Sequence, residues 1–327
     1  MLNDGPILVL DGACFSPLRC LADPADREEG LVQIGLVGLG RMGGPMARRL
    51  IKAGHDVVGF DVSLDVLDQA GRAGVRTAGS LAAVVEDLAA PRAVWLMLPA
   101  GAATGQVVDD IAGLLDPGDL VADGGNSDWR QGRPRSSQLA ARGIGFLDVG
   151  VSGGVEGWRH GYGITVGGAE ADFERLQPVL AALAAPAAVA RVGGTGAGHF
   201  AKAVHNGVEY GLMQAYAEGF ALLSAYDNLD ALAAMQVWQS GCAVRSFLLE
   251  QIAAALAENP ALKDIGTAVA DSGMGRWTAE EAIHLGVATP VLTAALHARF
   301  ASQDGSQLAS RLLVAARGQI GGHVTHG

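Results

Sequence analysis

The chain has 327 residues, of which 50% are hydrophobic and 17% are charged, a composition typical of a folded globular enzyme large enough for two domains. Its formal net charge of −11 argues against a nucleic-acid partner held by broad electrostatic attraction. Its cysteines, Cys14, Cys20 and Cys242, do not have the number or spacing of a disulfide framework or a zinc site. We therefore expect a cytoplasmic protein without a metal.

The N-terminal segment differs from the rest of the chain. The stretch Ile7 to Leu10 is too short for a signal-peptide core, and Asp23 to Glu29 is rich in charge. We expect residues 1–31 to form a poorly structured extension. We also hypothesise that the natural start lies at Leu31 or Val32, which N-terminal sequencing of the native protein would test.

Short apolar runs alternate with helical patterns over the first half of the chain. Strands are predicted at Gln33 to Val37, Val57 to Phe60, Ala93 to Leu98, Leu120 to Ala122 and Gly145 to Val149, with further strands at Gly161 to Gly168 and Ala188 to Val192. Helices are predicted at Pro45 to Ala53, Leu81 to Leu88 and Ala103 to Leu115. This alternation predicts a Rossmann-type, doubly wound parallel sheet over residues 32–196, with helices on both faces.

The most apolar stretch, Leu176 to Val192, is interrupted by Pro178 and Pro186. We interpret it as core rather than as a membrane span, so no membrane partner is expected.

From Gly198 onward the pattern is helical. Helical stretches are predicted at His199 to Ser224, Ala231 to Ser240, Ala243 to Glu258, Thr278 to Leu285 and Val291 to Ala316. Residues 197–327 are therefore predicted to form an all-α domain.

Three glycines, Gly38, Gly40 and Gly43, follow the first predicted strand with G-x-G-x-x-G spacing. The first permits a tight turn, the second lets the backbone approach a pyrophosphate, and the third allows close helix–strand packing. Asp61 at the end of the second strand strengthens the prediction of a dinucleotide site. The alternative is a glycine-rich structural turn.

The residue after Asp61 indicates which dinucleotide is bound. A carboxylate accepts hydrogen bonds from both ribose hydroxyls and repels a 2′-phosphate, and Val62 supplies no neutralising charge. NAD is therefore predicted in preference to NADP. The alternative role for Asp61 is to cap the next helix. The other residues assigned to the cofactor are Arg41, Met42, Leu98, Pro99, Ala100 and Asn126.

Lys202 and Glu209 are seven residues apart on the longest predicted helix, so they lie within about 20° of one face. His205 and Asn206 fall one turn beyond Lys202 on the same side. An amine, an imidazole, an amide and a carboxylate thus share one stripe of the helix. The alternative is a solvated face with a Lys–Glu ion pair.

The run Gly198 to Tyr210 resembles the K-x-V-H-N-G-x-E-Y motif of 6-phosphogluconate dehydrogenases, which carries the catalytic lysine and glutamate of that family. Other segments are similar in the same order: Asp123 to Ser127 to its D-G-G-N-S loop, Val151 to Gly157 to its S-G-G loop, and Gly275 to Thr278 to its G-[KR]-W-T turn. The resemblance runs from about Gln33 to His323. It is to the short bacterial form, because no second helical repeat follows.

The resemblance implies oxidative decarboxylation of 6-phosphogluconate to ribulose 5-phosphate with NAD, in the pentose phosphate pathway or gluconate catabolism. Lys202 would be the base and Glu209 the acid. The resemblance also assigns substrate contacts to Asn126, Ser152, Gly153, Gly154, His205, Asn206, Tyr210, Arg299, Arg317 and His323. Arg317 and His323 resemble the part of the family's tail that completes a neighbouring subunit's site, which implies a homodimer or homotetramer.

The chain departs from the long members of the family at Ser272 and Met274, where they place lysine and threonine as phosphate contacts. Phosphate binding would then depend more on Tyr210, Arg299 and Arg317. One alternative function is that of a 3-hydroxyisobutyrate-type dehydrogenase. Another is a non-catalytic dinucleotide sensor. The presence of both Lys202 and Glu209 argues against it.

Overall fold

The computed structural model describes residues 31–321. The proposed extension, Cys14, Cys20 and His323 lie outside the described residues, as does the side chain of Arg317. The hypothesis of a later natural start therefore stays a prediction.

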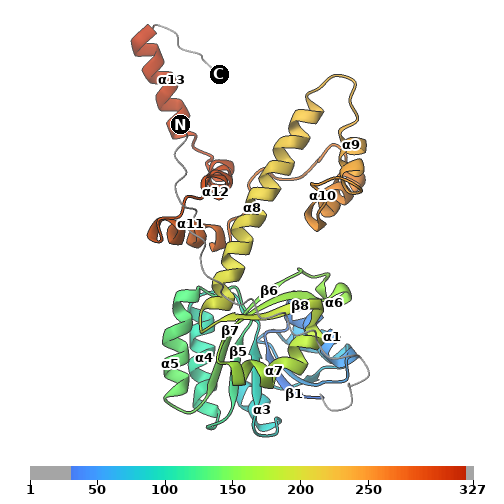
Figure 1. Ribbon diagram of the computed structural model, residues 1–327, viewed down its shortest axis with the longest axis vertical. Coiled ribbons are helices and arrows are strands. Elements are labelled where there is room, and N and C mark those ends of the chain that lie inside the picture. The colour runs from blue at the N-terminus through green and yellow to red at the C-terminus, as the bar shows by residue number, and fades with distance from the viewer. Residues whose placement is uncertain (1–30, 322–327) are drawn as a thin grey trace, which may run out of the picture.

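The first half of the described chain forms one eight-stranded sheet with the strand order β3-β2-β1-β4-β5-β6-β7-β8 (Figure 1). The strands are β1 (Gln33–Val37), β2 (Asp56–Phe60), β3 (Arg76–Thr77), β4 (Ala93–Leu96), β5 (Leu120–Asp123), β6 (Gly145–Ser152), β7 (Tyr162–Gly168) and β8 (Ala184–Gly193). The carboxyl ends of β1, β4 and β5 lie at one edge, with Val37 beside Leu96 and Leu96 beside Asp123. This edge carries the loops that follow those strands.

The sheet is mostly parallel, as predicted, and one pair of strands is antiparallel. β7 pairs with β6 in antiparallel register, with Val149 opposite Val166. The reason is the short connection between them, which holds only the one-turn helix α6 (Gly157–His160). A parallel return needs a longer crossover, and β8 obtains one through the helix α7 (Glu170–Leu183).

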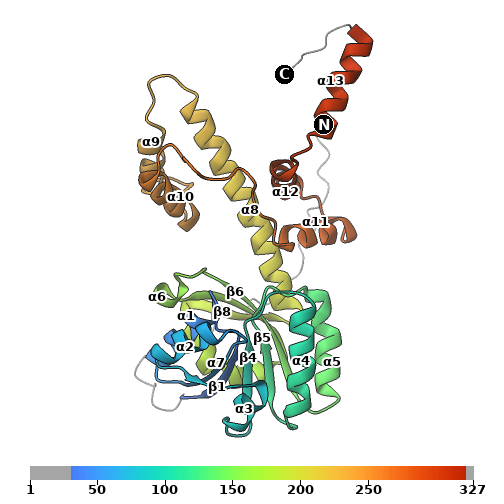
Figure 2. The same ribbon diagram turned by 180° about the vertical axis from the view of Figure 1, so that it is seen from behind.

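Helices cover both faces of the sheet, as predicted (Figures 1 and 2). One face packs against α1 (Gly43–Lys52), α2 (Leu64–Arg72) and α7, and the other against α3 (Leu81–Glu86), α4 (Ala102–Leu114) and α5 (Gly132–Ala140). Strand side chains alternate between the two cores: Trp95 joins the first, and Val94 and Leu96 join the second. The apolar stretch Leu176 to Val192 is thus half helix and half strand. No helix in residues 31–321 combines the length and apolarity needed to span a bilayer.

The second half is helical, also as predicted. The long helix α8 (Ala197–Ser224) leaves the sheet, with α9 (Ala231–Trp238) and α10 (Phe247–Glu258) on one side and α11 (Met274–His284) and α12 (Pro290–Gln303) on the other (Figures 1 and 2). Tyr216 of α8 packs with Met235, Leu249 and Leu256 in a small core shared with α9 and α10. The last helix, α13 (Leu308–Gly321), lies beyond α12 and away from the sheet.

Among the helical stretches whose bounds differ from the predicted ones, two are changed by local side-chain hydrogen bonds. The stretch Ala243 to Glu258 becomes helical only at Phe247, since the Ser246 hydroxyl accepts from Leu249 N at 3.1 Å. The stretch Val291 to Ala316 is divided into α12 and α13. There the Asp304 carboxylate accepts from Ser306 N at 3.0 Å and forms a turn.

Candidate active site

The glycine loop after β1 has the close backbone contacts that its spacing predicts. Gly38 has φ +92°, and a Cβ on it would lie 2.4 Å from the carbonyl oxygen of Met97. A Cβ on Gly43 would lie 1.8 Å from the carbonyl oxygen of Gly38, so α1 starts against the loop. Gly40 differs, because it is exposed and nothing lies within 4 Å of its Cβ position. That open backbone fits the approach of a pyrophosphate at a helix N-terminus.

Asp61 connects the glycine loop to the end of β2. Its carboxylate accepts hydrogen bonds from Leu39 N at 2.8 Å and from Ser63 N at 2.9 Å. Ser63, which precedes α2, makes no side-chain capping bond, so Asp61 supports the entry to α2 as well as the loop. Each carboxylate oxygen keeps a lone pair for a further donor such as a ribose hydroxyl. The adjacent Val62 is 90% exposed.

The segment after β4 packs against the glycine loop. A Cβ on Gly38 would lie 3.0 Å from Leu98 Cδ2, and the buried Thr104 hydroxyl donates to the Pro99 carbonyl at 2.7 Å. Ala100 and Arg41 are exposed beside this contact. The residues assigned to the cofactor from β1, β2 and β4 therefore lie at the carboxyl ends of neighbouring strands, where open α/β sheets bind ligands.

The D-G-G-N-S loop after β5 is held by one buried carboxylate. Asp123 is 0% exposed and accepts from Gly125 N at 3.1 Å, the Ser127 hydroxyl at 2.8 Å and Arg135 Nη1 at 2.7 Å. Asn126 is exposed on the loop that these bonds hold. A loop with a satisfied buried anchor can hold an exposed amide in a fixed place.

Lys202 lies two turns into α8, where the helix crosses the sheet. Its side chain is buried, with 8% exposed, and a Cβ on Gly150 of β6 would lie 2.5 Å from Lys202 Cβ. Burial lowers the pKa of the Lys202 amine below its ordinary value, and the Glu209 carboxylate opposes that shift. The charge that acts on the pKa of Lys202 is thus that of an anion, and burial outweighs it.

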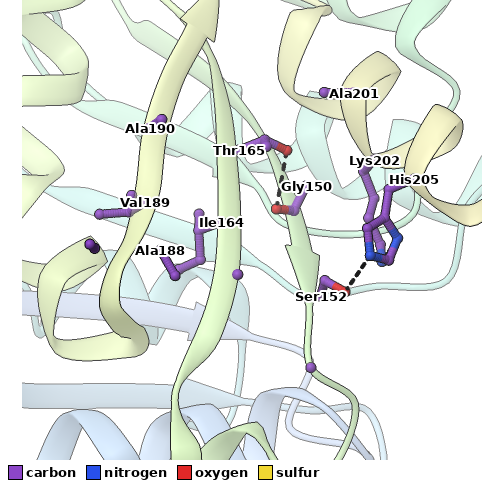
Figure 3. Close-up of a pocket in the computed structure, with 13 residues that line it drawn as sticks. Gly150, Ser152, Ile164, Thr165, Ala188, Val189, Ala190, Ala201, Lys202 and His205 are labelled. Atoms are coloured by element: carbon purple, nitrogen blue, oxygen red, sulfur yellow. Dashed lines mark hydrogen bonds between the residues drawn. The ribbon is translucent and has the colours of Figure 1, made fainter. Parts of the chain in front are cut away.

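His205 lies at the centre of the polar stripe on α8. Its Nδ1 is 3.4 Å from Lys202 Nζ, 3.2 Å from Asn206 Oδ1 and 3.7 Å from Glu209 Oε2. Its Nε2 is 3.3 Å from the Ser152 hydroxyl at the end of β6 (Figure 3). The structure thus brings these five predicted residues together. A solvated Lys–Glu pair does not describe them, since Lys202 is buried and Glu209 is closest to His205.

A cavity of about 440 Å³ opens beside this cluster. Lys202, His205, Ser152 and Gly153 line one side, and the apolar segment Ala187 to Ala190 of β8 lines another (Figure 3). Gly153 has φ +125° and Gly154 has φ +57°, so the S-G-G loop turns sharply with backbone that glycine adopts at low cost. Asn126, Glu209 and Tyr210 lie outside the cavity wall.

A second cluster lies farther along α8, at Tyr210. The Arg299 guanidinium of α12 stacks 3.6 Å from the centre of the Tyr210 ring and donates to the Ala270 carbonyl at 3.0 Å. The Tyr210 hydroxyl lies 3.2 Å from the Ser272 hydroxyl, whereas Met274 is fully buried. Tyr210, Arg299 and Ser272 are therefore together, and Met274 serves packing.

Arg317 is not brought to this cluster. Its backbone lies on α13, which both views place far from the end of α8 that enters the sheet. His323 lies outside the described residues.

Two further polar residues, Asp148 and His199, were not predicted as site residues from the sequence and are 0% and 1% exposed. A carboxylate within the apolar strand run at Asp148 was a usable signal, because a buried charge needs partners. His199 had no such signal, since a histidine on a helix indicates nothing about its burial.

Comparison with known proteins agrees with this geometry. Residues 33–194 match the model of the NAD binding domain of 6-phosphogluconate dehydrogenase, and residues 198–317 match that of the 6-phosphogluconate dehydrogenase C-terminal domain. The chain is 40% identical over 296 residues to an NAD(+)-dependent, decarboxylating 6-phosphogluconate dehydrogenase of Haloferax volcanii, covering 89% of this chain and 98% of that protein. It is 36% identical to the putative 6-phosphogluconate dehydrogenase YqeC of Bacillus subtilis, covering 90% and 99%.

Solved structures of related dehydrogenases have a similar fold. The 6-phosphogluconate dehydrogenase of Plasmodium falciparum, studied with NADP+ and with 6-phosphogluconate, superposes with a TM-score of 0.78 at 26% identity, covering 90% of this chain and 66% of that one. A 3-hydroxyisobutyrate dehydrogenase of Mycobacterium tuberculosis superposes with a TM-score of 0.68 at 26% identity, covering 84% and 93%. With both halves of the chain matched, the protein belongs to the 6-phosphogluconate dehydrogenase family.

Proposed function

We propose that this enzyme oxidatively decarboxylates 6-phospho-D-gluconate to D-ribulose 5-phosphate and carbon dioxide, with NAD as the hydride acceptor. The observation that carries the proposal is the buried Lys202, whose lowered pKa favours the neutral amine, joined through His205 to Glu209 beside a cavity. A base with a lowered pKa and an acid on the same helix are what the two halves of this reaction require.

Lys202 acts first. Its neutral amine takes the proton from the hydroxyl at carbon 3 as that carbon is oxidised to a ketone. Bound NAD supplies the chemistry of hydride acceptance. Asn206 holds the reacting hydroxyl near Lys202, while His205 and Ser152, which already contact each other, orient the carboxylate end. The backbone of Gly153 and Gly154 lies on the same side of the substrate.

Decarboxylation follows from the electronics of the 3-keto acid, because the ketone accepts the electron pair of the breaking carbon–carbon bond. Lys202, now an ammonium, donates its proton to the developing oxyanion. An enediol remains. Glu209 protonates carbon 1 of the pentulose while the hydroxyl at carbon 2 returns its proton to Lys202, which gives the product ketone. These steps call on no metal ion, so undiminished turnover in the presence of a chelator is expected.

The cofactor would lie along the carboxyl ends of β1, β2 and β4. Gly38, Gly40 and Gly43 with Arg41 and Met42 would contact the pyrophosphate, and Asp61 the adenosine ribose. Leu98, Pro99 and Ala100 would line the nicotinamide side, where Asn126 would contact both ligands. The exposed Val62 offers no cation for a 2′-phosphate, which supports NAD over NADP.

The phosphate would bind at the Tyr210 cluster. Arg299 presents a guanidinium that can pair two oxygens, although Ala270 already takes one donor. We propose that Arg317 and His323 of a neighbouring subunit complete this end, in a homodimer or homotetramer. Exposed apolar side chains on α13, such as Leu312 at 67% and Leu313 at 66%, support burial of that helix against a partner.

The roles proposed for the two domains and the proposed cellular location are inferred from the sequence. Residues 32–196 would act as the NAD-binding domain and residues 197–327 as the substrate and dimerisation domain. The sparse cysteines support a cytoplasmic location.

A paired assay tests the proposal. We expect NADH and carbon dioxide to form in equal amounts from 6-phosphogluconate with NAD, with a much lower kcat/KM for NADP and no turnover of 3-hydroxyisobutyrate. Turnover of 3-hydroxyisobutyrate alone would establish the alternative that the Mycobacterium structure suggests. Binding of NAD without either product would establish a sensor.

A double variant, Asp61→Ser with Val62→Arg, tests the basis of coenzyme choice. Removing the repelling carboxylate and adding a guanidinium at an open position should move the ratio of kcat/KM values toward NADP by roughly 100-fold. Leu64→Arg, at another exposed position, is the matched control. An unchanged ratio in the double variant would refute the role of Asp61.

A further inference from the structure

The first turn of α8 rests directly on the sheet, one turn before Lys202. A Cβ on Gly198 would lie 2.3 Å from the carbonyl oxygen of Asp148 and 2.7 Å from Gly167 N. The Thr165 hydroxyl donates to the Gly198 carbonyl at 3.0 Å. This end of α8 therefore has little freedom to move relative to β6 and β7.

Two buried aspartates lie side by side beneath the site. Asp123 of β5 and Asp148 of β6 are register partners, and both are 0% exposed. Asp123 anchors the Asn126 loop, as described above. Asp148 accepts from Gly196 N at 2.6 Å and His199 N at 2.8 Å, and so anchors the start of α8. One carboxylate thus anchors the loop that carries Asn126, and the other anchors the helix that carries Lys202.

The His199 side chain joins these two anchored elements. It is 1% exposed, and its Nε2 lies 2.9 Å from the Asp123 carbonyl oxygen. A carbonyl only accepts, so Nε2 carries the hydrogen and donates it. Asp123 precedes Asn126 by three residues and His199 precedes Lys202 by three, which makes this bond a short link between the loop and the base.

We propose that His199 is a positioning residue that fixes the Asn126 loop relative to Lys202. The inference rests on the proposed function, in which the reacting carbon lies between a nicotinamide oriented by Asn126 and the amine of Lys202. A displacement of about 1 Å in such an arrangement lowers turnover by up to about 100-fold. The bond from His199 opposes that displacement without touching substrate.

A purely structural role for His199 would have different consequences. Loss of a buried hydrogen bond alone lowers the free energy of unfolding and leaves the chemistry of the remaining folded enzyme intact. His55 provides the comparison, because it is 7% exposed and its ring accepts from the Val32 backbone on the far side of the same domain. His55→Leu should therefore lower stability but not kcat.

The test compares His199→Leu, which removes the donor, with His199→Gln, which keeps an N–H at similar reach. With 6-phosphogluconate and NAD, we expect His199→Leu to lower kcat about 10- to 100-fold, while the Kd for NAD changes less than about twofold. The deuterium isotope effect from substrate labelled at carbon 3 should rise as hydride transfer becomes slower. His199→Gln should restore most of kcat. If His199→Leu does not fold, His199→Asn, whose amide is shorter, takes its place.

Hydrogen exchange supplies a readout independent of turnover. The amides of Gly124 to Ser127 should exchange faster in His199→Leu than in the wild type, with no change in the glycine loop after β1. Unaltered exchange in the Asn126 loop, or a kcat loss that His199→Gln does not restore, would overturn the positioning role. Wild-type enzyme that does not turn over 6-phosphogluconate would instead refute the proposed function, while faster loop exchange in the variant would still support the link.

Discussion

The two halves of α8 have opposite surroundings. In the half next to the sheet, Gly198, Lys202, Gly207 and Tyr210 are buried. Toward the other end, Tyr216 packs against α9 and α10, but other apolar side chains face solvent, and Leu222 is 75% exposed. The proposed catalytic groups thus lie where this chain encloses the helix, and the exposed apolar side chains of the far half fit the subunit contact proposed above.

Small residues explain how the first half becomes enclosed. A Cβ on Gly207 would lie 2.9 Å from Leu292 Cδ2, and one on Gly211 would lie 3.3 Å from Val291 Cγ1. Thr278 of α11 donates its hydroxyl to the Ala203 carbonyl at 2.8 Å. This close approach of α11 and α12 encloses Tyr210. Lys202 is buried instead against Gly150 of β6, and this burial is the main cause of its lowered pKa.

The largest expected effect is that of Lys202→Met in the enclosed half. Loss of the base should reduce kcat by about 10⁴-fold. The same variant should raise the free energy of unfolding by about 1 kcal/mol, because an apolar side chain replaces a buried amine. NADH formation and urea unfolding measure the two effects.

The stabilisation by Lys202→Met should also depend on pH. Folding lowers the pKa of Lys202, so the full cost of the buried ammonium is present below the folded pKa. That cost diminishes as pH rises through the folded pKa toward the ordinary value. Lys52→Met, at an exposed position, is the control. A variant no more stable than wild type at any pH would show that burial of Lys202 carries no cost.

Glu209→Gln should have the next largest effect, a fall in kcat of roughly 100-fold. Because the Glu209 carboxylate raises the pKa of Lys202, its removal should lower that pKa further. Acylation of the lysines by an amine-reactive reagent at a series of pH values, followed by mass spectrometry, measures the pKa of Lys202 directly. The chain has three lysines, so Lys52 and Lys263 serve as internal references. If the acylation of Lys202 in Glu209→Gln shifted to higher pH, it would contradict the expected electrostatic interaction between Glu209 and Lys202.

The smallest effect on chemistry is expected from Leu222→Glu in the exposed half. A charge on that surface should weaken subunit association, which light scattering after gel filtration would detect. KM for the sugar phosphate should then rise about 10-fold at low protein concentration, since a neighbour would supply part of the phosphate end. The Kd for NAD should not change. Leu64→Glu, at an exposed position on α2, is the matched control. If both variants assembled equally well, the exposed half of α8 would not be a subunit contact.

Much of this protein follows from patterns local to the chain. The alternation of apolar runs with helical spacing predicted the sheet, because backbone periodicity is set within a few residues. Gly38, Gly40 and Gly43 predicted the dinucleotide loop, since only a tight turn with close backbone contacts requires that spacing. The seven-residue separation of Lys202 and Glu209 predicted a shared face.

Tertiary structure decided what local patterns do not carry. The burial of Lys202 depends on Gly150, which comes from a strand distant in sequence, and the antiparallel β7 depends on the length of one connection. The link from His199 to Asp123 joins residues 76 positions apart. Burial, the pKa shift of Lys202 and the loop-to-helix hydrogen bond arise only when distant segments pack together, because each depends on which atoms exclude water from a given side chain.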